Sequence, residues 1–400
     1  MLSENTIKIV KSTVPLLVNA GTGVTEYFYN RMFTHNPELK DIFNMGNQET
    51  GKQPFALFNA LAAFAQHIDN LDVLKSALSR ISHKHTSLNI LPEHYPIVGL
   101  HLIETLRELL PDAFTPEVEQ AWTEAYALLA DLCITQEHGL YQQNAEKQGG
   151  WLGARGFIIS QKQPESEQVT SFTLTPKDGG QVAEHIPGQY LGIKVKPTDA
   201  EYMEIRQYSI SDKVQTDSYR ISIKKECNEP QGIVSNYLHS LSEGSEVDIF
   251  PPAGDFYLQF NDKPVVLISA GVGLTPMMSM LETLVEAPLL HSVHYLHACE
   301  NNQQHSFAKR VNALCATHDK VDAYTWYNKE VIETGIVDDR TMFTGLMELS
   351  HIKAQLPIEE GDYYVCGPNA FMSFIKKQLL LLGVDHSRIH YEVFGPHEAL

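Results

Sequence analysis

The spacing of apolar residues changes twice along this chain of 400 residues, and the two changes divide it into three parts. From Lys52 to His138 the chain contains a single glycine, Gly99. Apolar residues in this stretch recur every three or four positions, which is the interval of an amphipathic helix. Such an interval gathers the apolar side chains on one face of each helix, so the first part is predicted to be all helical.

The paired glycines Gly149 and Gly150 end this helical pattern, and beyond them apolar residues alternate with polar ones. Alternation places successive side chains on opposite faces of a strand. Short strands separated by Gly, Pro, Asp and Asn are typical of a small antiparallel barrel. Strands are expected over residues 157–159, 169–174, 190–195, 208–210, 219–223, 247–249 and 256–258.

After Lys263 the pattern changes again, because short apolar runs now alternate with helical stretches. Pro264–Ala270 is followed by the helical stretch Thr275–Val285, and Tyr363–Cys366 is followed by Ala370–Leu382. This alternation is typical of a doubly wound parallel sheet. The chain is therefore predicted to be a multidomain protein, with an all-α part, an antiparallel β-barrel and an α/β part in that order.

The composition excludes several classes of partner. The chain has 30 Lys and Arg against 49 Asp and Glu, a formal net charge of −19. Nucleic acids and anionic membrane surfaces are bound by clustered positive charge, so neither is an expected partner. No apolar run approaches the length of a membrane helix, and the first residues lack the pattern of an export signal. The five cysteines have no CxxC spacing, which argues against a disulfide framework and favours a cytoplasmic location.

Two strand–turn–helix junctions in the third part have the composition of a phosphate-binding site. The first is Gly271-Val272-Gly273-Leu274-Thr275-Pro276, and the second is Cys366-Gly367-Pro368. Glycines allow the backbone to approach a phosphate closely, and a helix N-terminus favours negative charge. Pro276 stands where a full G-x-G-x-x-G would have its third glycine, so a plain tight turn is the alternative for the first junction.

A further segment lies inside the predicted barrel, where Arg206-Gln207-Tyr208-Ser209 follows Tyr190 by one strand. Arginine can fork onto a diphosphate, and a tyrosine ring can stack on a flat heterocycle. The order of this segment, the two glycine turns and a terminal aromatic at Phe394 resembles the ferredoxin–NADP reductase family over residues 151–400.

The resemblance implies that FAD lies on the barrel, with Arg206 at its diphosphate, Tyr208 beside one flavin face, Phe394 near the other face and Ser209 near N5. A nicotinamide nucleotide is implied across the two glycine turns. Gly232-Ile-Val234-Ser235 resembles the family's second phosphate contact, although the preceding residues 227–230 replace the paired glycines that are common there. The other positions assigned to cofactors in this way are Tyr190, Gln207, Glu392, Val393, Gly395 and Pro396.

Several histidines lie in the first 150 residues, and their spacing does not select one as a metal ligand. The run 28–37, together with Phe43, Gln53, Leu57 and Lys84-His85-Thr86, resembles the bacterial globins, and the whole chain is similar to the flavohaemoglobins. This resemblance implies haem b, with His85 as the proximal iron ligand and Phe43 against the porphyrin. Gln53, Leu57 and Tyr29 would line the distal pocket, and the Tyr29 hydroxyl would donate to bound dioxygen.

Tyr95 and Glu137 resemble the family's proximal relay, in which a carboxylate accepts a hydrogen bond from the ligand imidazole and raises its basicity. Lys84 and Glu392 resemble positions near the haem and the flavin that influence the redox balance. Pro54 suits the first turn of a helix and not its interior, so the distal helix is expected to begin near Gln53.

The resemblance as a whole implies a nitric oxide dioxygenase that takes electrons from NAD(P)H through FAD to haem and converts nitric oxide and dioxygen to nitrate. The expected divisions are a globin domain over 1–138, a linker over 139–151, an FAD-binding β-barrel domain over 152–262 and an NAD(P)-binding α/β domain over 263–400. A cytoplasmic monomer is expected, with nitric oxide and dioxygen as its small-molecule partners.

Three alternatives stay open at this point. The chain could be a carrier or sensor globin for dioxygen or nitric oxide, with a reductase that only keeps the iron ferrous. It could instead be a haem-free flavin reductase with a helical docking domain. The choice between NADH and NADPH is also open, and Lys309 and Arg310 are the candidate contacts of a ribose 2′-phosphate.

Overall fold

The structure, a computed structural model, describes residues 2–45, 51–198, 200–227, 231–329 and 341–395. Contacts between its elements divide the chain into two compact units. The first comprises Met1–Glu146, Trp151–Ala154 and Lys194–Arg206, and the second comprises Lys147–Gly150, Arg155–Ile193 and Gln207–Leu400. The barrel and the α/β part therefore belong largely to one unit, and the boundaries of the three expected domains stay a prediction.

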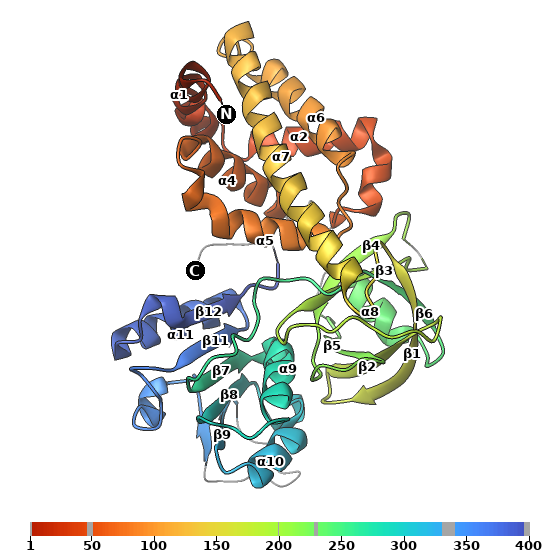
Figure 1. The fold of residues 1–400 in the computed structure, drawn as a ribbon, viewed down its shortest axis with the longest axis vertical. Helices are drawn as coiled ribbons and strands as arrows, with labels where there is room; N and C mark the ends of the chain where they lie inside the picture. Colours follow the sequence, from red (N-terminus) through yellow and green to blue (C-terminus); the bar gives the residue numbers. More distant parts are fainter. Residues whose placement is uncertain (1, 46–50, 199, 228–230, 330–340, 396–400) are drawn as a thin grey trace. The chain divides into compact units, whose positions relative to one another are not determined.

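The described residues of the first unit up to residue 146 fold into helices and their connections, as the spacing of apolar residues predicts (Figure 1). Its core is formed by large side chains such as Phe28, Met32, Leu106 and Trp122, each at most 2% exposed. The helices are α1 (Glu4–Ala20), α2 (Gly23–His35), η1 (Pro37–Asp41), α4 (Lys52–Gln66), η2 (Leu71–Leu74), α5 (Lys75–Thr86), α6 (His94–Leu109) and α7 (Pro116–Glu146).

Two helix boundaries bear on the site. α4 begins at Lys52, after Gly51 with φ +72°, so Gln53 and Pro54 both lie in its first turn, where proline is tolerated. α7 continues to Glu146, through the expected boundary at residue 138 and into the expected linker 139–151. It continues because no proline follows Pro116 in this stretch and because the face that carries Cys133 and Glu137 is buried.

The antiparallel sheet of the second part has the strand order β4-β3-β6-β1-β2-β5. A bridge between Ile210, just after β4, and Ile221 of β5 joins the two edge strands, so the sheet closes on itself as a barrel does. The elements are β1 (Arg155–Pro164), β2 (Val169–Pro176), β3 (Tyr190–Val195), β4 (Glu204–Ser209), β5 (Tyr219–Lys224), β6 (Glu246–Ile249) and α8 (Ile233–Ser240).

One expected strand of the barrel is wrong, because residues 256–258 form no strand. Phe256 and Leu258 are buried and the residue between them is exposed, which gives the alternation of a strand. Their side chains instead join the core of the α/β part, and the Leu258 N–H donates to the carbonyl oxygen of Pro187 at 2.8 Å. The alternation of buried and exposed residues at 256–258 therefore belongs to an extended connection and not to a strand of the sheet.

The α/β part contains a parallel sheet of order β10-β9-β8-β7-β11-β12, with helices on both faces (Figure 1). Its chain order reverses at β7, which lies between β8 and β11; open sheets bind ligands at the carboxyl ends of the strands beside such a reversal. The strands are β7 (Val265–Ala270), β8 (Val293–Cys299), β9 (Val321–Tyr327), β10 (Met342–Thr344), β11 (Asp362–Cys366) and β12 (Ile389–Glu392). The helices are η3 (Gly271–Gly273), α9 (Leu274–Leu284), η4 (Asn302–Gln304), α10 (Ala308–Thr317), η6 (Leu349–Ile352), α11 (Asn369–Leu382) and η7 (His386–Arg388).

Within the described ranges, no helix combines the length and the hydropathy that crossing a bilayer requires.

Candidate functional site

A partly buried hydrogen-bonded triad forms around His85, near the end of α5. The Nδ1 atom of His85 lies 2.7 Å from Oε1 of Glu137 on α7 and 3.1 Å from the hydroxyl of Tyr95 on α6. The Tyr95 hydroxyl donates to the same carboxylate oxygen at 2.6 Å. Residues of three helices thus meet at the imidazole of His85.

The triad fixes which nitrogen of His85 is able to bind a metal. A carboxylate only accepts hydrogen bonds, so Nδ1 carries the hydrogen and the lone pair lies on Nε2. Glu137 is 2% exposed, whereas the side chain of His85 is 32% exposed, so the ring is held at one edge and open at another. A neutral imidazole with a carboxylate partner is the usual form of a histidine metal ligand, and these residues fit a haem iron at Nε2.

Burial raises the pKa values of two groups in and beside the triad. It raises the pKa of the Tyr95 hydroxyl far above its usual range, and the neighbouring Cys133 and Glu137 add to that shift. Burial also raises the pKa of the Cys133 thiol to about 12. Both groups therefore stay protonated at neutral pH. Tyr126 adds a further hydrogen bond from its hydroxyl to the Tyr95 carbonyl oxygen at 2.7 Å.

The expected distal residues gather on α2 and α4 of the same unit. Tyr29 is 5% exposed and packs among aromatic rings, with Phe43 edge-on to it at a centroid distance of 5.8 Å. The side-chain amide of Gln53 donates to the Tyr29 hydroxyl at 3.5 Å. Leu57 packs against the same core. The first turn of α4 therefore holds Gln53 next to Tyr29, and Lys84 lies on α5 beside His85.

The two glycine turns of the second unit touch each other at the carboxyl edge of the sheet. β7 and β11 pair in register, with Ser269 opposite Cys366. A Cβ atom on Gly273 would lie 2.5 Å from the carbonyl carbon of Cys366 and 2.7 Å from the nitrogen of Gly367. Only glycine allows this approach, and it places the start of α9 against the turn that leads into α11.

The remaining residues of these turns have local roles. Gly271 has φ +54°, and the Thr275 hydroxyl donates to the carbonyl oxygen of Val272 at 3.0 Å, so this hydroxyl closes the turn. Burial raises the pKa of the Cys366 thiol well above its usual range, which keeps the thiol protonated. The other expected residues are Leu274 and Pro276 in the first turn of α9 and Pro368 before α11.

The flavin segment, Arg206–Ser209, forms most of β4. Arg206 pairs with Glu204 at 2.7 Å and donates to the Ile205 carbonyl oxygen, and Ser209 is 7% exposed. Tyr190 begins β3, the neighbour of β4 in the sheet. Glu392 of β12 lies opposite Cys366 of β11 in the sheet, and Val393 after it is buried. Phe394 is 48% exposed, and Gly395 has φ +149°. Pro396 lies outside the described residues.

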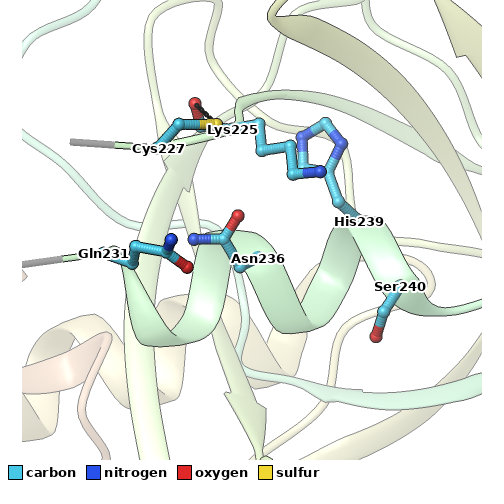
Figure 2. A pocket seen from close by; sticks show the side chains of 6 residues that line it. All are labelled: Lys225, Cys227, Gln231, Asn236, His239 and Ser240. Carbon is cyan, nitrogen blue, oxygen red and sulfur yellow. Dashed lines mark hydrogen bonds between the residues drawn. The ribbon is translucent and has the colours of Figure 1, made fainter. Parts of the chain in front are cut away.

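The expected second phosphate contact lies at the start of α8. Gly232 precedes this helix, Val234 is buried, and the Ser235 hydroxyl donates to the carbonyl oxygen of Gly232 at 3.3 Å. A cavity of 330 Å³ lies beside α8 (Figure 2). It is lined from the helix by Asn236, His239 and Ser240 and from the preceding segment by Lys225, Cys227 and Gln231.

Sequence reasoning missed a second set of polar contacts, which lies on α9. Glu282 is 1% exposed and pairs with Arg220 of β5 and with Arg310 of α10. The signal in the sequence is an acid in the otherwise apolar face of α9, but its partners lie far away in the sequence. Arg310, a candidate contact of a ribose 2′-phosphate, is thus paired with a carboxylate at 2.9 Å.

Comparison with known protein families assigns a separate domain to each of the three parts of the chain. The family model for globins matches residues 26–133, the model for the oxidoreductase FAD-binding domain matches residues 157–257, and the model for the oxidoreductase NAD-binding domain matches residues 267–377. The expected set of cofactors, haem, FAD and a nicotinamide nucleotide, is confirmed at the level of these three domains.

Relatives extend the match to the whole chain. A flavohemoprotein of Vibrio cholerae serotype O1 is 52% identical over 403 residues, with 100% of both chains covered. The crystal structure of a flavohemoglobin from Malassezia yamatoensis, with bound FAD and heme, has a TM-score of 0.88 at 26% identity and covers 98% of this chain and 100% of its own. The FAD/NAD-binding domain of a nitric oxide dioxygenase from Vibrio cholerae has a TM-score of 0.56 at 46% identity over 60% of this chain and 99% of its own.

The helical unit with its histidine–carboxylate triad, the antiparallel sheet and the parallel sheet thus occur together in the expected order, and the chain belongs to the flavohaemoproteins.

Proposed function

We propose that this flavohaemoprotein is a nitric oxide dioxygenase that uses NAD(P)H to convert nitric oxide and dioxygen to nitrate. The observation that carries the proposal is the His85–Glu137–Tyr95 triad in a chain that also has FAD- and NAD-binding domains. A carboxylate on the ligand imidazole favours oxygen chemistry over simple storage, because it makes the imidazole a stronger electron donor. The nitric oxide dioxygenase named among the similar structures supports the same activity.

When bound, the haem supplies one-electron chemistry at iron, and FAD divides each hydride from the nicotinamide into single electrons. His85 would hold the iron through Nε2, and Glu137 keeps the hydrogen on Nδ1. On the other side, Tyr29 would donate a hydrogen bond to a polar ligand, with Gln53 orienting its hydroxyl. Phe43 and Leu57 would exclude water from this pocket.

Residues of the barrel and of the α/β part would bind and orient the two nucleotides. Arg206 would exchange its contact with Glu204 for the FAD diphosphate, and Tyr208, Ser209 and Phe394 would surround the flavin ring. The backbone N–H groups of the Gly271–Pro276 turn would receive the phosphates of the nicotinamide nucleotide. The other proposed contacts are Tyr190, Gln207, Gly232, Val234, Ser235, Cys366, Gly367, Pro368, Glu392, Val393 and Gly395.

The proposal is tested by measuring aerobic consumption of nitric oxide, with NADH or NADPH as the donor, in protein replete with haem and FAD. We expect many turnovers, with nitrate as the product and two molecules of nitric oxide consumed per nucleotide, because one hydride carries two electrons. A reaction that stops after one equivalent would identify a carrier or sensor instead. Protein without the intense haem absorption band near ~400 nm would identify a flavin reductase. The cytoplasmic location and the monomeric state stay predictions.

A further inference from the structure

α9 connects the proposed nucleotide turn, Gly271–Pro276, with residues of the barrel part. It begins directly after the Gly271–Gly273 turn, and every residue from Leu274 to Glu282 is buried. Its contacts with the barrel part are polar as well as apolar. Ser279 accepts or donates a hydrogen bond with Nε2 of His185 at 3.1 Å, and Glu286, just after the helix, pairs with Lys213 at 2.7 Å.

The more deeply buried of the two ion pairs with the barrel part is the one between Glu282 and Arg220. Oε2 of Glu282 accepts from Nη2 of Arg220 at 3.0 Å, while Oε1 accepts from Nε of Arg310 at 2.9 Å. Glu282 is 1% exposed and the Arg220 side chain is 19% exposed. A charge buried to this degree is tolerated only when it is paired and hydrogen-bonded. Moving the two side chains apart would leave the Glu282 carboxylate buried without this partner, so their relative position is strongly restrained.

Arg220 is in turn hydrogen-bonded to Ser211, just after the end of β4. Its Nη2 donates to the carbonyl oxygen of Ser211, and its Nε donates to the Ser211 hydroxyl at 3.3 Å. The guanidinium lies 5.1 Å from the centre of the Phe307 ring, which covers it. Ser211 follows Ser209 by two residues. A chain of short contacts thus runs from the flavin segment through Arg220 and Glu282 into α9.

We propose that Arg220 and Glu282 are positioning residues for hydride transfer, and that their ion pair holds α9, with the nucleotide turn at its N-terminus, in a fixed place relative to the flavin segment. This inference rests on the proposed function. In the step concerned, a hydride leaves C4 of the reduced nicotinamide and joins N5 of the flavin. The nicotinamide is oxidised by two electrons, the flavin is reduced, and the second proton comes from solvent.

The ion pair matters because hydride transfer depends steeply on the approach of the two rings. A displacement of about 1 Å, caused by a change remote from the reacting atoms, can slow a reaction on the order of 100-fold. As positioning residues, Arg220 and Glu282 would act through α9 and not on the reacting atoms. Loss of the pair is therefore expected to lower the rate of the chemical step and to leave nucleotide affinity unchanged, since the Gly271–Pro276 turn itself is intact.

The test is anaerobic stopped-flow reduction of the flavin in the full-length holoprotein, with NADH varied in concentration. In Glu282→Gln, which keeps the shape of the side chain and removes its charge, we expect the limiting rate to fall by on the order of 100-fold. The NADH concentration at half-maximal rate should not change, and the long-wavelength absorbance of the nicotinamide–flavin complex should weaken. Arg220→Lys keeps the positive charge, so its limiting rate should fall less than that of Glu282→Gln.

Two measurements separate positioning from general stability. Backbone hydrogen exchange without any nucleotide should be faster over 274–284 and 219–224 in Glu282→Gln, while the rest of the second unit is unchanged. Glu286→Gln is the matched control, because it breaks an ion pair between the same two parts in which the Glu286 side chain is 57% exposed, and such pairs contribute little. It should reduce its flavin at the wild-type rate.

Equal limiting rates in Glu282→Gln and wild type would overturn the inference and leave the proposed function standing. If Glu282→Gln does not retain FAD, the test is made with Arg220→Lys instead. A wild-type limiting rate together with wild-type hydrogen exchange in Arg220→Lys would also overturn the inference. Wild-type protein whose flavin is reduced by neither NADH nor NADPH would refute the proposed function, and the inference with it.

Discussion

Replacing Glu137 by Gln should raise the reduction potential of the haem iron. The carboxylate accepts from Nδ1 of His85 at 2.7 Å and from the Tyr95 hydroxyl at 2.6 Å, and the side chain is almost fully buried. Glutamine has nearly the same shape, and its amide oxygen can accept the same two hydrogen bonds. The substitution therefore removes the charge and keeps the contacts, which isolates the electrostatic effect on the imidazole.

The magnitude follows from the strength of the two kinds of hydrogen bond. A bond to a charged acceptor is worth about 1.5–3 kcal/mol and one between neutral groups about 0.5–1.5 kcal/mol, so the change is on the order of 1.4 kcal/mol. A carboxylate stabilises the more positive ferric iron over the ferrous form through the imidazole. If the whole difference acts on that balance, the one-electron potential rises by about 60 mV in Glu137→Gln.

The assay is a spectroelectrochemical titration of the haem band in the full-length protein. The matched control is Glu124→Gln, the same substitution on the same helix, at a partly exposed carboxylate that accepts from Thr6 and Gln120. It should leave the potential unchanged. A potential in Glu137→Gln that equals the wild-type value, with haem still bound, would show that the carboxylate does not govern the electron density on His85.

Three further changes have predicted outcomes. Tyr29→Phe should slow nitric oxide consumption by roughly 10- to 100-fold with haem retained, since one hydrogen bond to a charged group is lost; an unchanged rate would exclude Tyr29 from the reaction. Gly273→Ala should lower the free energy of unfolding by about 1–3 kcal/mol in denaturant titrations, because its Cβ would overlap Cys366; wild-type stability would contradict the close approach. Burial lowers the pKa of His185 to about 4, so its neutral form is favoured in the folded state. The unfolded state therefore binds more protons as the pH falls from about 6.5 to about 4, and up to about 3 kcal/mol of stability should be lost over that window; His185→Gln should flatten this part of the pH profile, and an identical profile would refute the assignment.

The fold was predictable because each part of the chain has its own apolar period. Residues 256–258 show the limit of that reasoning, since alternate burial occurs in an extended connection as well as in a strand. Helix ends were less predictable. α7 passes residue 138 with the buried face of Cys133 and Glu137 continued by Asn144, which local turn residues do not reveal.

The site was predictable only in part from the residues themselves. No spacing rule selects His85, because Glu137 and Tyr95 reach it from two other helices, and only the resemblance to globins named all three. Glu282 stands out as an acid among apolar residues, but the sequence does not reveal its partner Arg220, since the two residues are 62 positions apart and lie on a helix and a strand. Glycine turns were more informative, because the positive φ of Gly271 restricts the residue type locally, although Gly273 is restricted by its close approach to Cys366.

α7 has a mechanical consequence for the iron site. The helix is 31 residues long, about 46 Å, and it runs without a break from Pro116 to Glu146, where the chain enters Lys147–Gly150 of the second unit. Glu137 lies only about 14 Å from that end along the helix axis. A helix is stiff over such a length, so the carboxylate that accepts from His85 is carried by a continuous rigid segment and not by a loop.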